Sequence, residues 1–394
     1  MSIYLDHAAT TPLRREAFSA MTPLLTDVYG NPSSPHAAGR RARAALDEAR
    51  ERLATALNAE PRELIFTSGG SEAINLALKG VAWAGKGRGN RIVTSAVEHH
   101  AVLHTLRHLE KFGFEIVELP VDRYGRLDPD QLDSAINERT IAVSLLLANN
   151  EVGTLQTLPE LVRRVRGHEG VLLHLDAVAA AAYVALDVKA LDVDMLSLAA
   201  HKFEGPKGSG LLYLRRGTIL LPQIQGGSQE RYRRAGTENV AGAMAMAIAY
   251  ELAVAEREQT VAHVARLRDR LRDALLNVPG VELTGHPRRR LPCLLSLIVR
   301  DVDGAELVSA LDLDGLAASV GSACTTGSLE PSHVLTGLGF PDDEARGSLR
   351  LSVGRTNTDA EIEAAVGIIP AAIARLRGAV GAVPADVLGQ VSTA

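Results

Sequence analysis

Residues 171–176 read Val171-Leu-Leu-His-Leu-Asp176, and residues 195–202 read Met195-Leu-Ser-Leu-Ala-Ala-His-Lys202. Each run is apolar and has a charged side chain at or just beyond its carboxyl end. Parallel strands buried on both faces read as continuous apolar runs, and open α/β sheets bind ligands at the carboxyl ends of such strands. The two runs therefore predict two parallel strands that bring an acid and a lysine to a ligand site.

The same pattern extends along the chain on both sides of these runs. Apolar runs alternate with amphipathic stretches, which is typical of an α/β domain with a mostly parallel sheet. We expect seven strands, at 64–67, 91–95, 115–119, 141–147, 171–176, 195–198 and 210–213, and helices at 37–57, 71–84, 101–111, 129–136, 158–166 and 240–254.

A second, smaller α+β domain is expected after residue 255. A long helix covers about 240–276, and its second half is charged and periodic. Beyond it we expect strands at 294–299 and 348–352 and helices at 304–311 and 359–377. The predicted division is a segment 1–15 that packs with the small domain, a large domain 16–255 and a small domain 256–394. The end of the chain, from residue 378, is rich in Ala, Gly and Val and is expected to fray.

Composition excludes several classes of protein. The 394 residues are 46% hydrophobic and 23% charged, which is ordinary for a globular chain. The net charge of −5 and an aromatic content of 4% argue against direct binding of nucleic acid or of an anionic membrane. Two cysteines cannot build a disulfide framework. Because we find neither a secretory signal nor a membrane-spanning run, we expect a cytoplasmic protein.

A third feature is a glycine pair after an apolar strand, in Phe66-Thr-Ser-Gly-Gly-Ser-Glu-Ala73. Backbone N–H groups at the start of a helix, together with the Ser71 hydroxyl, can cradle a phosphate. The simpler reading is that the glycines turn the chain and that Ser71 caps the helix. Asp176 could likewise be a cap, and Lys202 a surface residue.

The combination is more specific than its parts. A phosphate cradle, an acid at one strand end and a lysine at the next strand end are what pyridoxal phosphate requires. The phosphate would lie on the helix N-terminus, Asp176 would pair with the pyridinium nitrogen, and Lys202 would bind the aldehyde. A lysine that is partly desolvated at a strand end has a lowered pKa and suits this chemistry.

The two cysteines lie in contrasting surroundings. Cys293 has apolar neighbours and is expected to be buried, whereas Cys324 lies in Ser319-Val-Gly-Ser-Ala-Cys-Thr-Thr-Gly-Ser-Leu-Glu-Pro-Ser332. An exposed thiol in a small-residue stretch suggests a nucleophile. We expect a mobile loop over about 320–331 that carries it.

At this point the chain resembles the group I cysteine desulfurases of the IscS/NifS type, within the aminotransferase class V family. The resemblance runs from residue 4 to residue 355, and its cysteine loop is the long form of the first group. The segments that match in order are Tyr4-Leu-Asp-His-Ala-Ala-Thr-Thr-Pro12, Gly30-Asn-Pro-Ser-Ser34, Val97-Glu-His-His100, Asn149-Asn-Glu-Val-Gly153, His201-Lys-Phe-Glu-Gly-Pro-Lys-Gly208, Arg234-Ala-Gly-Thr-Glu-Asn239 and Arg350-Leu-Ser-Val-Gly-Arg355.

The resemblance implies a fold-type I pyridoxal-phosphate enzyme that takes the sulfur of L-cysteine and releases L-alanine. It implies catalytic roles for Cys324, Lys202 and His99, cofactor contacts by Gly70, Ser71, His99, Asn150, Asp176, His201, Lys202 and Thr237, and substrate contacts by Asn31 and Arg350. In such enzymes the equivalent of His99 stacks on the cofactor ring and moves protons, and the equivalent of Cys324 carries a persulfide.

Partners are implied in the same way. Thr237 falls on a position whose hydroxyl reaches the phosphate across a dimer interface, which implies a homodimer. The sulfur would pass to an acceptor protein, such as an iron–sulfur scaffold or a thiolation relay protein. No metal is expected in the cofactor site, although Cys324 could ligate an iron–sulfur cluster transiently.

The chain departs from the family at two cofactor positions. Ala179 stands where the family usually has a Gln that donates to the phenolic oxygen, and Ala199 where it usually has a phosphate-binding Ser. The C-terminal stretch that often docks a scaffold is not recognisable either. Alternatives are a selenocysteine lyase, another class V lyase or aminotransferase, or a non-catalytic assembly partner. The cysteine stretch and the intact set of Lys202, His99 and Arg350 favour the desulfurase.

Overall fold

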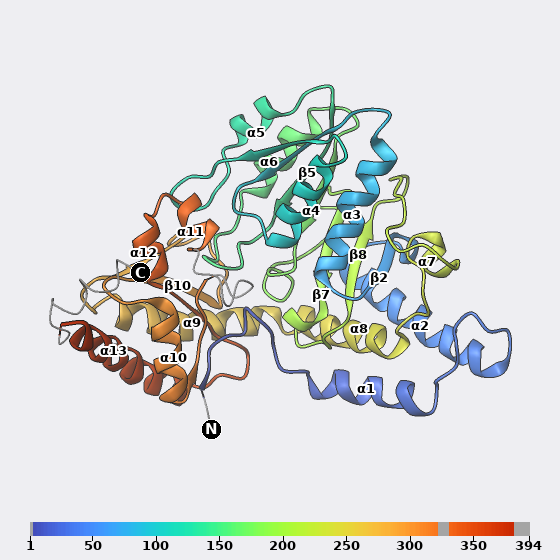
Figure 1. Cartoon of the computed structure of the whole chain (residues 1–394). Coiled ribbons are helices and arrows are strands. Elements are labelled where there is room, and N and C mark those ends of the chain that lie inside the picture. The colour runs from blue at the N-terminus through green and yellow to red at the C-terminus, as the bar shows by residue number, and fades with distance from the viewer. Residues whose placement is uncertain (1–2, 322–330, 382–394) are drawn as a thin grey trace, which may run out of the picture. The chain divides into compact units, whose positions relative to one another are not determined.

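The structure, a computed structural model, describes residues 3–321 and 331–381 (Figure 1). The chain divides into two compact units. The larger unit consists of Ala8–Asn150 and Thr154–Thr260, and the smaller unit is assembled from Met1–His7, Glu151–Gly153 and Val261–Ala394.

The larger unit is built on a seven-stranded sheet with the strand order β2-β8-β7-β6-β5-β3-β4. Strand β8 runs antiparallel to both of its neighbours, and every other neighbouring pair of this sheet is parallel. The predicted seven-stranded, mostly parallel sheet is therefore confirmed. Its strands are β2 (Leu64–Thr67), β3 (Arg91–Ser95), β4 (Glu115–Leu119), β5 (Thr140–Leu146), β6 (Leu172–Asp176), β7 (Met195–Ala199) and β8 (Gly210–Leu214).

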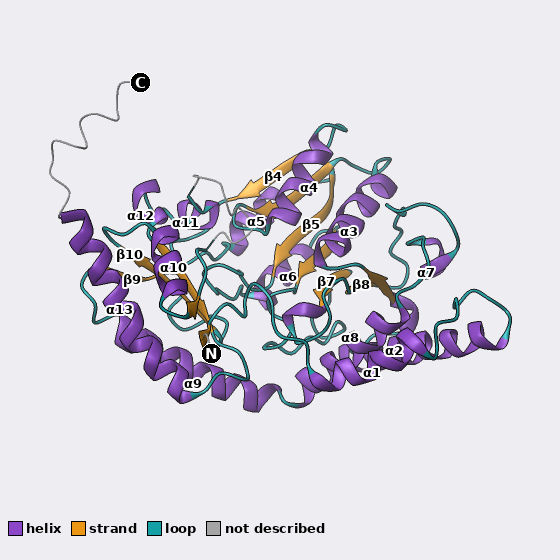
Figure 2. Cartoon of the chain, turned by 60° about the horizontal axis from the view of Figure 1, so that its bottom comes forward, coloured by secondary structure: helices purple, strands orange, loops and turns teal. Residues whose placement is uncertain are grey.

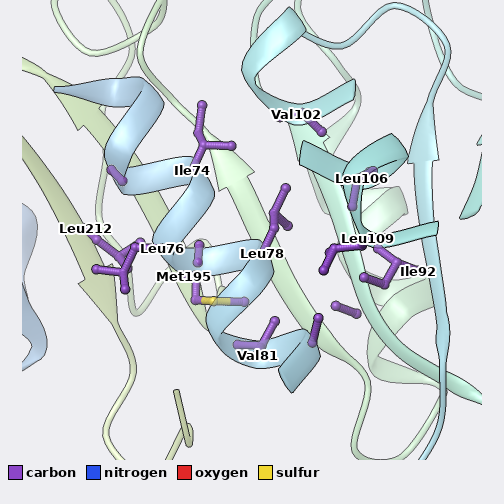
Figure 3. Packing of buried hydrophobic residues seen from close by; sticks show 14 of the residues in the cluster. Ile74, Leu76, Leu78, Val81, Ile92, Val102, Leu106, Leu109, Met195 and Leu212 are labelled. Atoms are coloured by element: carbon purple, nitrogen blue, oxygen red, sulfur yellow. The ribbon is translucent and has the colours of Figure 1, made fainter. Parts of the chain in front are cut away.

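One face of this sheet is covered by α3 (Gly70–Gly85) and α4 (His100–Glu110). Their apolar sides form a common core with the side chains of Ile92, Met195 and Leu212 (Figure 3). The core is almost wholly aliphatic, as the low aromatic content requires. Burial of this much aliphatic surface at about 25 cal/mol per Å² is what holds the helices on the sheet.

Further helices of the larger unit are α1 (Arg15–Thr26), α2 (Ala37–Leu57), α5 (Pro129–Ala135), α6 (Leu158–Arg166), α7 (Gln229–Tyr232) and α8 (Val240–Ala255), with short 3₁₀ turns η1 (Pro61–Glu63) and η2 (Ala200–Lys202). Helices α1 and α2 both pack on α8 (Figure 2). The sequence did not predict α1, because its signals are weak: Arg14 makes no side-chain cap and Pro23 lies inside the helix.

The long helix expected at 240–276 is two helices, α8 and α9 (Arg257–Leu275), separated by Glu256. Glu256 leaves helical geometry with φ −96° and ψ 4°, and its carboxylate accepts hydrogen bonds from Arg14 at 2.6 Å. The two units divide at Thr260, inside α9, whereas we expected the boundary at 255. Residues 8–15 group with the larger unit, and only residues up to His7 group with the smaller one.

The smaller unit contains a three-stranded antiparallel sheet of order β12-β10-β9 and a parallel pair of β1 with β11. The strands predicted at 294–299 and 348–352 are confirmed, whereas β1, β9 and β11 are too short for a periodic pattern. The elements are β1 (Ile3–Tyr4), β9 (Val281–Leu283), β10 (Leu294–Val299), α10 (Gly304–Leu313), β11 (Leu316–Ala317), α11 (His333–Gly337), α12 (Asp342–Arg346), β12 (Ser348–Ser352) and α13 (Asp359–Gly381). Over the described ranges, a helix long and apolar enough to cross a membrane is not found.

Candidate functional site

The glycine pair lies where strand β2 gives way to helix α3. A Cβ atom on Gly70 would lie 2.8 Å from Cγ2 of Val178 and 3.4 Å from Cβ of Ala199. Glycine at this position therefore lets the first turn of α3 approach the carboxyl ends of β6 and β7. The first N–H groups of a helix have no partner within it, so this close approach brings a set of donors to the strand ends.

The other side of the turn is open. A Cβ on Gly69 would meet no atom within 4 Å, whereas a Cβ on Gly210 would lie 2.5 Å from the Gly69 backbone. Gly210 thus keeps β8 close beneath the turn, and the turn itself faces open space. Ser71 is exposed in the first turn of the helix. This arrangement fits a phosphate group, which binds to helix N-termini through backbone N–H groups.

Asp176 ends strand β6 and is buried, with 6% of its surface exposed. Its Oδ1 accepts a hydrogen bond from the Val178 backbone N–H at 2.9 Å. Burial raises the pKa of the Asp176 carboxyl to about 6, while that hydrogen bond and the charge of Lys202 act in the opposite direction. A carboxylate that is buried here is stabilised by a cation, such as a protonated ring nitrogen.

Lys202 ends the 3₁₀ turn that follows β7, and it is half-buried. Its Nζ donates hydrogen bonds to the backbone carbonyls of Ala8 and Ala9. The next residue of the N-terminal segment is Thr10, and its hydroxyl oxygen lies 3.3 Å from Nδ1 of His201. The pKa of His201 is lowered to about 4, first by burial and then by the charges of Lys202 and another lysine nearby, so this imidazole is neutral near pH 7.

His99 caps helix α4, and its Nδ1 accepts a hydrogen bond from the Ala101 N–H at 3.0 Å. In the neutral ring the proton is therefore on Nε2. Asn150 is half-buried beyond the end of β5, next to Asn149, whose amide donates to the Val97 carbonyl at 3.0 Å. This hydrogen bond joins the two segments that carry His99 and Asn150.

Glu98 is a site residue that the sequence did not single out. It is buried, and its Oε1 accepts hydrogen bonds from the Ser95 hydroxyl at 2.6 Å and from the Leu146 N–H at 3.0 Å. Burial raises its pKa to about 8, and the nearby charge of Asp176 adds to the rise. Its position just beyond the carboxyl end of β3 is the signal that could have revealed it.

A second missed feature is the buried row of polar side chains on strands β5, β6 and β7. His174 lies between two serines, with Nδ1 2.9 Å from the Ser144 hydroxyl and Nε2 2.8 Å from the Ser197 hydroxyl. Burial lowers the pKa of His174 to about 3, so the ring is neutral. The Ser197 hydroxyl is thus hydrogen-bonded to His174. Ser197 lies two residues before Ala199 on β7, so the two side chains point to the same face of the sheet.

Asn31 and Thr237 lie together in a different place. Both are exposed and line a surface pocket of about 240 Å³ in the larger unit, together with Leu25 and Tyr29. Asn31 also accepts a hydrogen bond from the Ser33 N–H at 2.9 Å. Gly70, Asp176 and Lys202 do not line this pocket.

Arg350 belongs to the smaller unit, on β12, and is 2% exposed. Its Nη2 lies 3.0 Å from Oδ1 of Asp6, and its Nη1 donates to the Gly321 carbonyl at 3.4 Å. Cys324 and most of the predicted loop lie outside the described residues. Cys293 is a free, buried cysteine, as expected. Among the described side chains, no group of three or more His, Cys, Asp or Glu is placed to hold a metal ion.

The larger unit therefore brings together three of the predicted groups: the Gly70 turn, Asp176 and Lys202. The contact of Gly70 with Val178 and Ala199 joins the cradle to both strand ends, and the charge of Lys202 acts on Asp176. A donor-lined turn, a buried acid and a primary amine are the groups that pyridoxal phosphate needs, so these residues fit that cofactor.

A model of the aminotransferase class V family matches residues 3–365. The chain is 46% identical to the cysteine desulfurase IscS of Methanosarcina thermophila, over 95% of this chain and 93% of that protein. The chain belongs to the cysteine desulfurases of the aminotransferase class V family. The predicted family is thereby confirmed.

Two solved structures share the fold of this chain. A NifS-like protein superposes with a TM-score of 0.91 at 35% identity, covering 95% of this chain and all of that one. The protein SspA, solved in complex with cysteine, superposes with a TM-score of 0.80 at 31% identity, covering 91% of this chain and all of that one. The predicted fold class is confirmed by these likenesses.

Proposed function

We propose that this protein is a pyridoxal-phosphate-dependent L-cysteine desulfurase that passes sulfur from L-cysteine to an acceptor protein through Cys324. The observation that carries the proposal is the meeting of the Gly70 turn, Asp176 and Lys202 in one unit, in a chain of this family. When bound, pyridoxal phosphate supplies an electron sink that makes the substrate α-proton acidic.

The larger unit holds the cofactor in this proposal. The N–H groups around Gly70, the Ser71 hydroxyl and His201 bind the phosphate, and Lys202 binds the aldehyde. Asp176 stabilises the protonated ring nitrogen, which in turn keeps the buried carboxyl ionised. Asn150 would lie near the cofactor.

Proton transfer falls to Lys202 and His99. Because Nδ1 of His99 accepts from the Ala101 N–H, the neutral ring carries its proton on Nε2. From that atom it can exchange the proton with the bound substrate. Lys202 has a primary amine that can accept the substrate α-proton and return it to the product. Arg350 and Asn31 bind the substrate carboxylate, and Arg350 can give a bidentate pair.

Sulfur transfer falls to Cys324. Its thiolate attacks the sulfur of the bound substrate, the new S–S bond forms as the C–S bond breaks, and the carbon skeleton leaves as L-alanine after protonation. An acceptor protein, either an iron–sulfur scaffold or a thiolation relay protein, then takes the outer sulfur from Cys324.

Transient ligation of an iron–sulfur cluster by Cys324 is part of the same proposal. We place the reaction in the cytoplasm, where thiols are kept reduced.

The working protein is a homodimer in this proposal, with Thr237 reaching the phosphate of the other subunit. Two large apolar side chains, Leu25 and Tyr29, are 60% and 78% exposed and line the same pocket as Thr237. Exposed apolar side chains favour association, and here two of them line the pocket that Thr237 also lines.

The dimer can be tested by mixing Lys202→Ala and Thr237→Ala subunits. Mixed dimers would carry both substitutions in one site and neither in the other. Each mixed dimer should therefore regain up to about half of the activity of the parent dimer. If activity does not return although mass spectrometry shows that the subunits exchange, the sites are not shared.

The sulfur route is tested by mass spectrometry of the cysteine-treated enzyme. The extra sulfur should lie on Cys324, and Cys324→Ser should bind cysteine yet release little sulfide. Cys293→Ser is the matched control and should keep its activity, because Cys293 is buried in the smaller unit. Extra sulfur on Cys293, or alanine formed without any persulfide, would overturn the proposal.

A further inference from the structure

Arg350 already has an acidic partner within the smaller unit. Its Nη2 lies 3.0 Å from Oδ1 of Asp6, a residue 344 positions away in the chain. The Arg350 side chain is 2% exposed and the Asp6 side chain 19%. The pair is thus largely shielded from water, and a charge pair in such a place is screened far less than one on the surface.

The position of Asp6 is fixed by its backbone. Strand β1 pairs in parallel with β11, and Asp6 forms a bridge with Ser352 at the end of β12. The Ser352 N–H donates to the Leu5 carbonyl at 2.7 Å, and the Tyr4 hydroxyl donates to the Asp6 carbonyl at 3.1 Å. Asp6 is therefore held beside the strand that carries Arg350, and the pair does not depend on a flexible segment.

Both charges act on a third group. The pKa of the Tyr4 hydroxyl is raised by burial and by the negative charge of Asp6, and it is lowered by Arg350. The guanidinium also donates from Nη1 to a neutral acceptor, the Gly321 carbonyl, at 3.4 Å. Asp6 thus places a negative charge directly on the Arg350 guanidinium.

A substrate carboxylate on Arg350 would share the guanidinium with the carboxylate of Asp6. Two carboxylates on one guanidinium repel each other, and the repulsion is stronger where solvent is partly excluded. The same repulsion acts on the amino-acid product, because L-alanine keeps the carboxylate. An acidic neighbour therefore weakens the binding of substrate and product alike, while it also orients the guanidinium.

We propose that Asp6 is a positioning residue that sets the affinity of Arg350 for amino-acid carboxylates and so speeds release of the product. The inference rests on the proposed role of Arg350. Aspartate at this position holds the guanidinium in one orientation, and its charge keeps the carboxylate of the bound amino acid from binding too tightly.

The test is Asp6→Asn in the holoenzyme. The amide keeps an oxygen that can accept from Arg350 but removes the negative charge. We expect the KM for L-cysteine and the inhibition constant of L-alanine each to fall about three- to tenfold, with kcat unchanged or lower because product leaves more slowly. The KM for L-cysteine methyl ester, which has no carboxylate, should stay within about twofold.

Two variants serve as controls. Asp6→Glu keeps the charge and should keep the KM for L-cysteine near that of the parent enzyme. Asp314→Asn removes an acid that pairs with Arg375 at 2.7 Å on the surface of the same unit and should change neither KM nor the inhibition constant. Equal changes with the acid and the ester, or a higher KM for L-cysteine in Asp6→Asn, would overturn the inference.

Failure of the proposed function gives a different result. Arg350→Lys should raise the KM for L-cysteine and leave that for the ester nearly unchanged, because only the carboxylate contact is weakened. If Arg350→Lys has no such effect, the role of Arg350 is wrong, whatever Asp6→Asn does. If Arg350→Lys behaves as expected and Asp6→Asn does not, only the inference about Asp6 falls.

Discussion

The two units obtain their functional side chains in different ways. In the larger unit, Gly70, Asp176 and Lys202 each lie at or just beyond the end of a strand of one sheet. In the smaller unit, Arg350 meets Asp6 only because residues from the start of the chain pair with β11 and β12. Short runs of sequence therefore indicate the chemistry of the larger unit, whereas that of the smaller unit depends on pairing between distant segments.

This difference has a consequence for substitutions. The strand ends of the larger unit are supported by the sheet and by the aliphatic core beneath α3. A change in a side chain there should remove chemistry and leave the fold intact. A substitution that breaks an ion pair between distant segments should instead change the stability of the fold or the affinity for a ligand.

The largest effect is expected for Lys202→Ala. Because the lysine binds the cofactor and moves protons, turnover should fall by about 10³-fold or more, and the borohydride-reducible adduct on Lys202 should be lost. The melting temperature of the cofactor-free protein should change little, which would support the comparison. Lys207→Ala is the matched control in the following turn, and an adduct found on Lys207 would refute the assignment.

A large loss of stability is expected when the buried pair of Arg50 and Glu230 is broken. The two side chains lie 2.6 Å apart with 5% and 2% exposed. They join α2 to α7, which is a turn rather than a regular helix because Glu230, Arg231 and Tyr232 all have positive φ. Such a strained turn persists only when its surroundings hold it. Glu230→Ala should therefore lower the free energy of unfolding by about 3–5 kcal/mol.

Urea unfolding measures this loss, with Glu48→Ala as the control. Glu48 pairs with Arg52 on the surface of the same helix, and breaking such a pair costs only about 0.3–0.5 kcal/mol. The turn leads to Thr237, so cofactor retention should weaken together with stability. Equal losses in the two variants would show that the larger unit does not depend on this long-range pair.

A pH-dependent effect is expected at Glu98. Its pKa in the folded protein, about 8, lies above the usual 4.5. The stability that the protonated form contributes is therefore fully present below pH 4.5 and is lost as pH rises through about 8. Glu98→Gln should match the parent near pH 4.5 and become more stable than it by up to about 1.4 kcal/mol per pH unit, until the difference levels off.

Unfolding midpoints measured between pH 5 and pH 9 test this expectation. A difference between Glu98→Gln and the parent that stays constant over this range would mean that the carboxyl is ionised throughout. Ser134→Ala, at an exposed position in α5, should show no pH-dependent difference.

The smallest effects are expected at the two alanines. Ala199 is 1% exposed and faces the Gly70 turn, and Ser197 is already bonded to His174. A hydroxyl in Ala199→Ser could add a hydrogen bond to the phosphate, worth about 1.5–3 kcal/mol, so cofactor release should slow about tenfold or more. Unchanged release kinetics would mean that another group already fills this role.

At Ala179 the expected change is spectroscopic. A donor in Ala179→Gln would stabilise the anionic form of the phenolic oxygen. The visible absorption of the bound cofactor should therefore titrate at lower pH, without loss of turnover. An unshifted titration would show that the amide does not reach the oxygen.

Most of the larger unit could be predicted from sequence because its elements are long or continuously apolar. The seven strands and helices α2, α3 and α8 lie close to the predicted ranges. Helix α1 was missed, and the break at Glu256 was not foreseen, because the charge of Arg14 that meets Glu256 comes from a segment 242 residues away.

The sequence by itself determined the apolar runs, the glycine turn and the chemistry at the strand ends. These depend on interactions within a few residues: alternation, backbone freedom at glycine and the direction of parallel strands. Only the tertiary structure decided that Glu98 lies beside Asp176, that His174 lies between two serines, and that Asp6 pairs with Arg350. The physical reason is that charge pairs and hydrogen bonds act over only a few ångströms. They therefore depend on the register in which distant strands align, and the sequence pattern does not set that register.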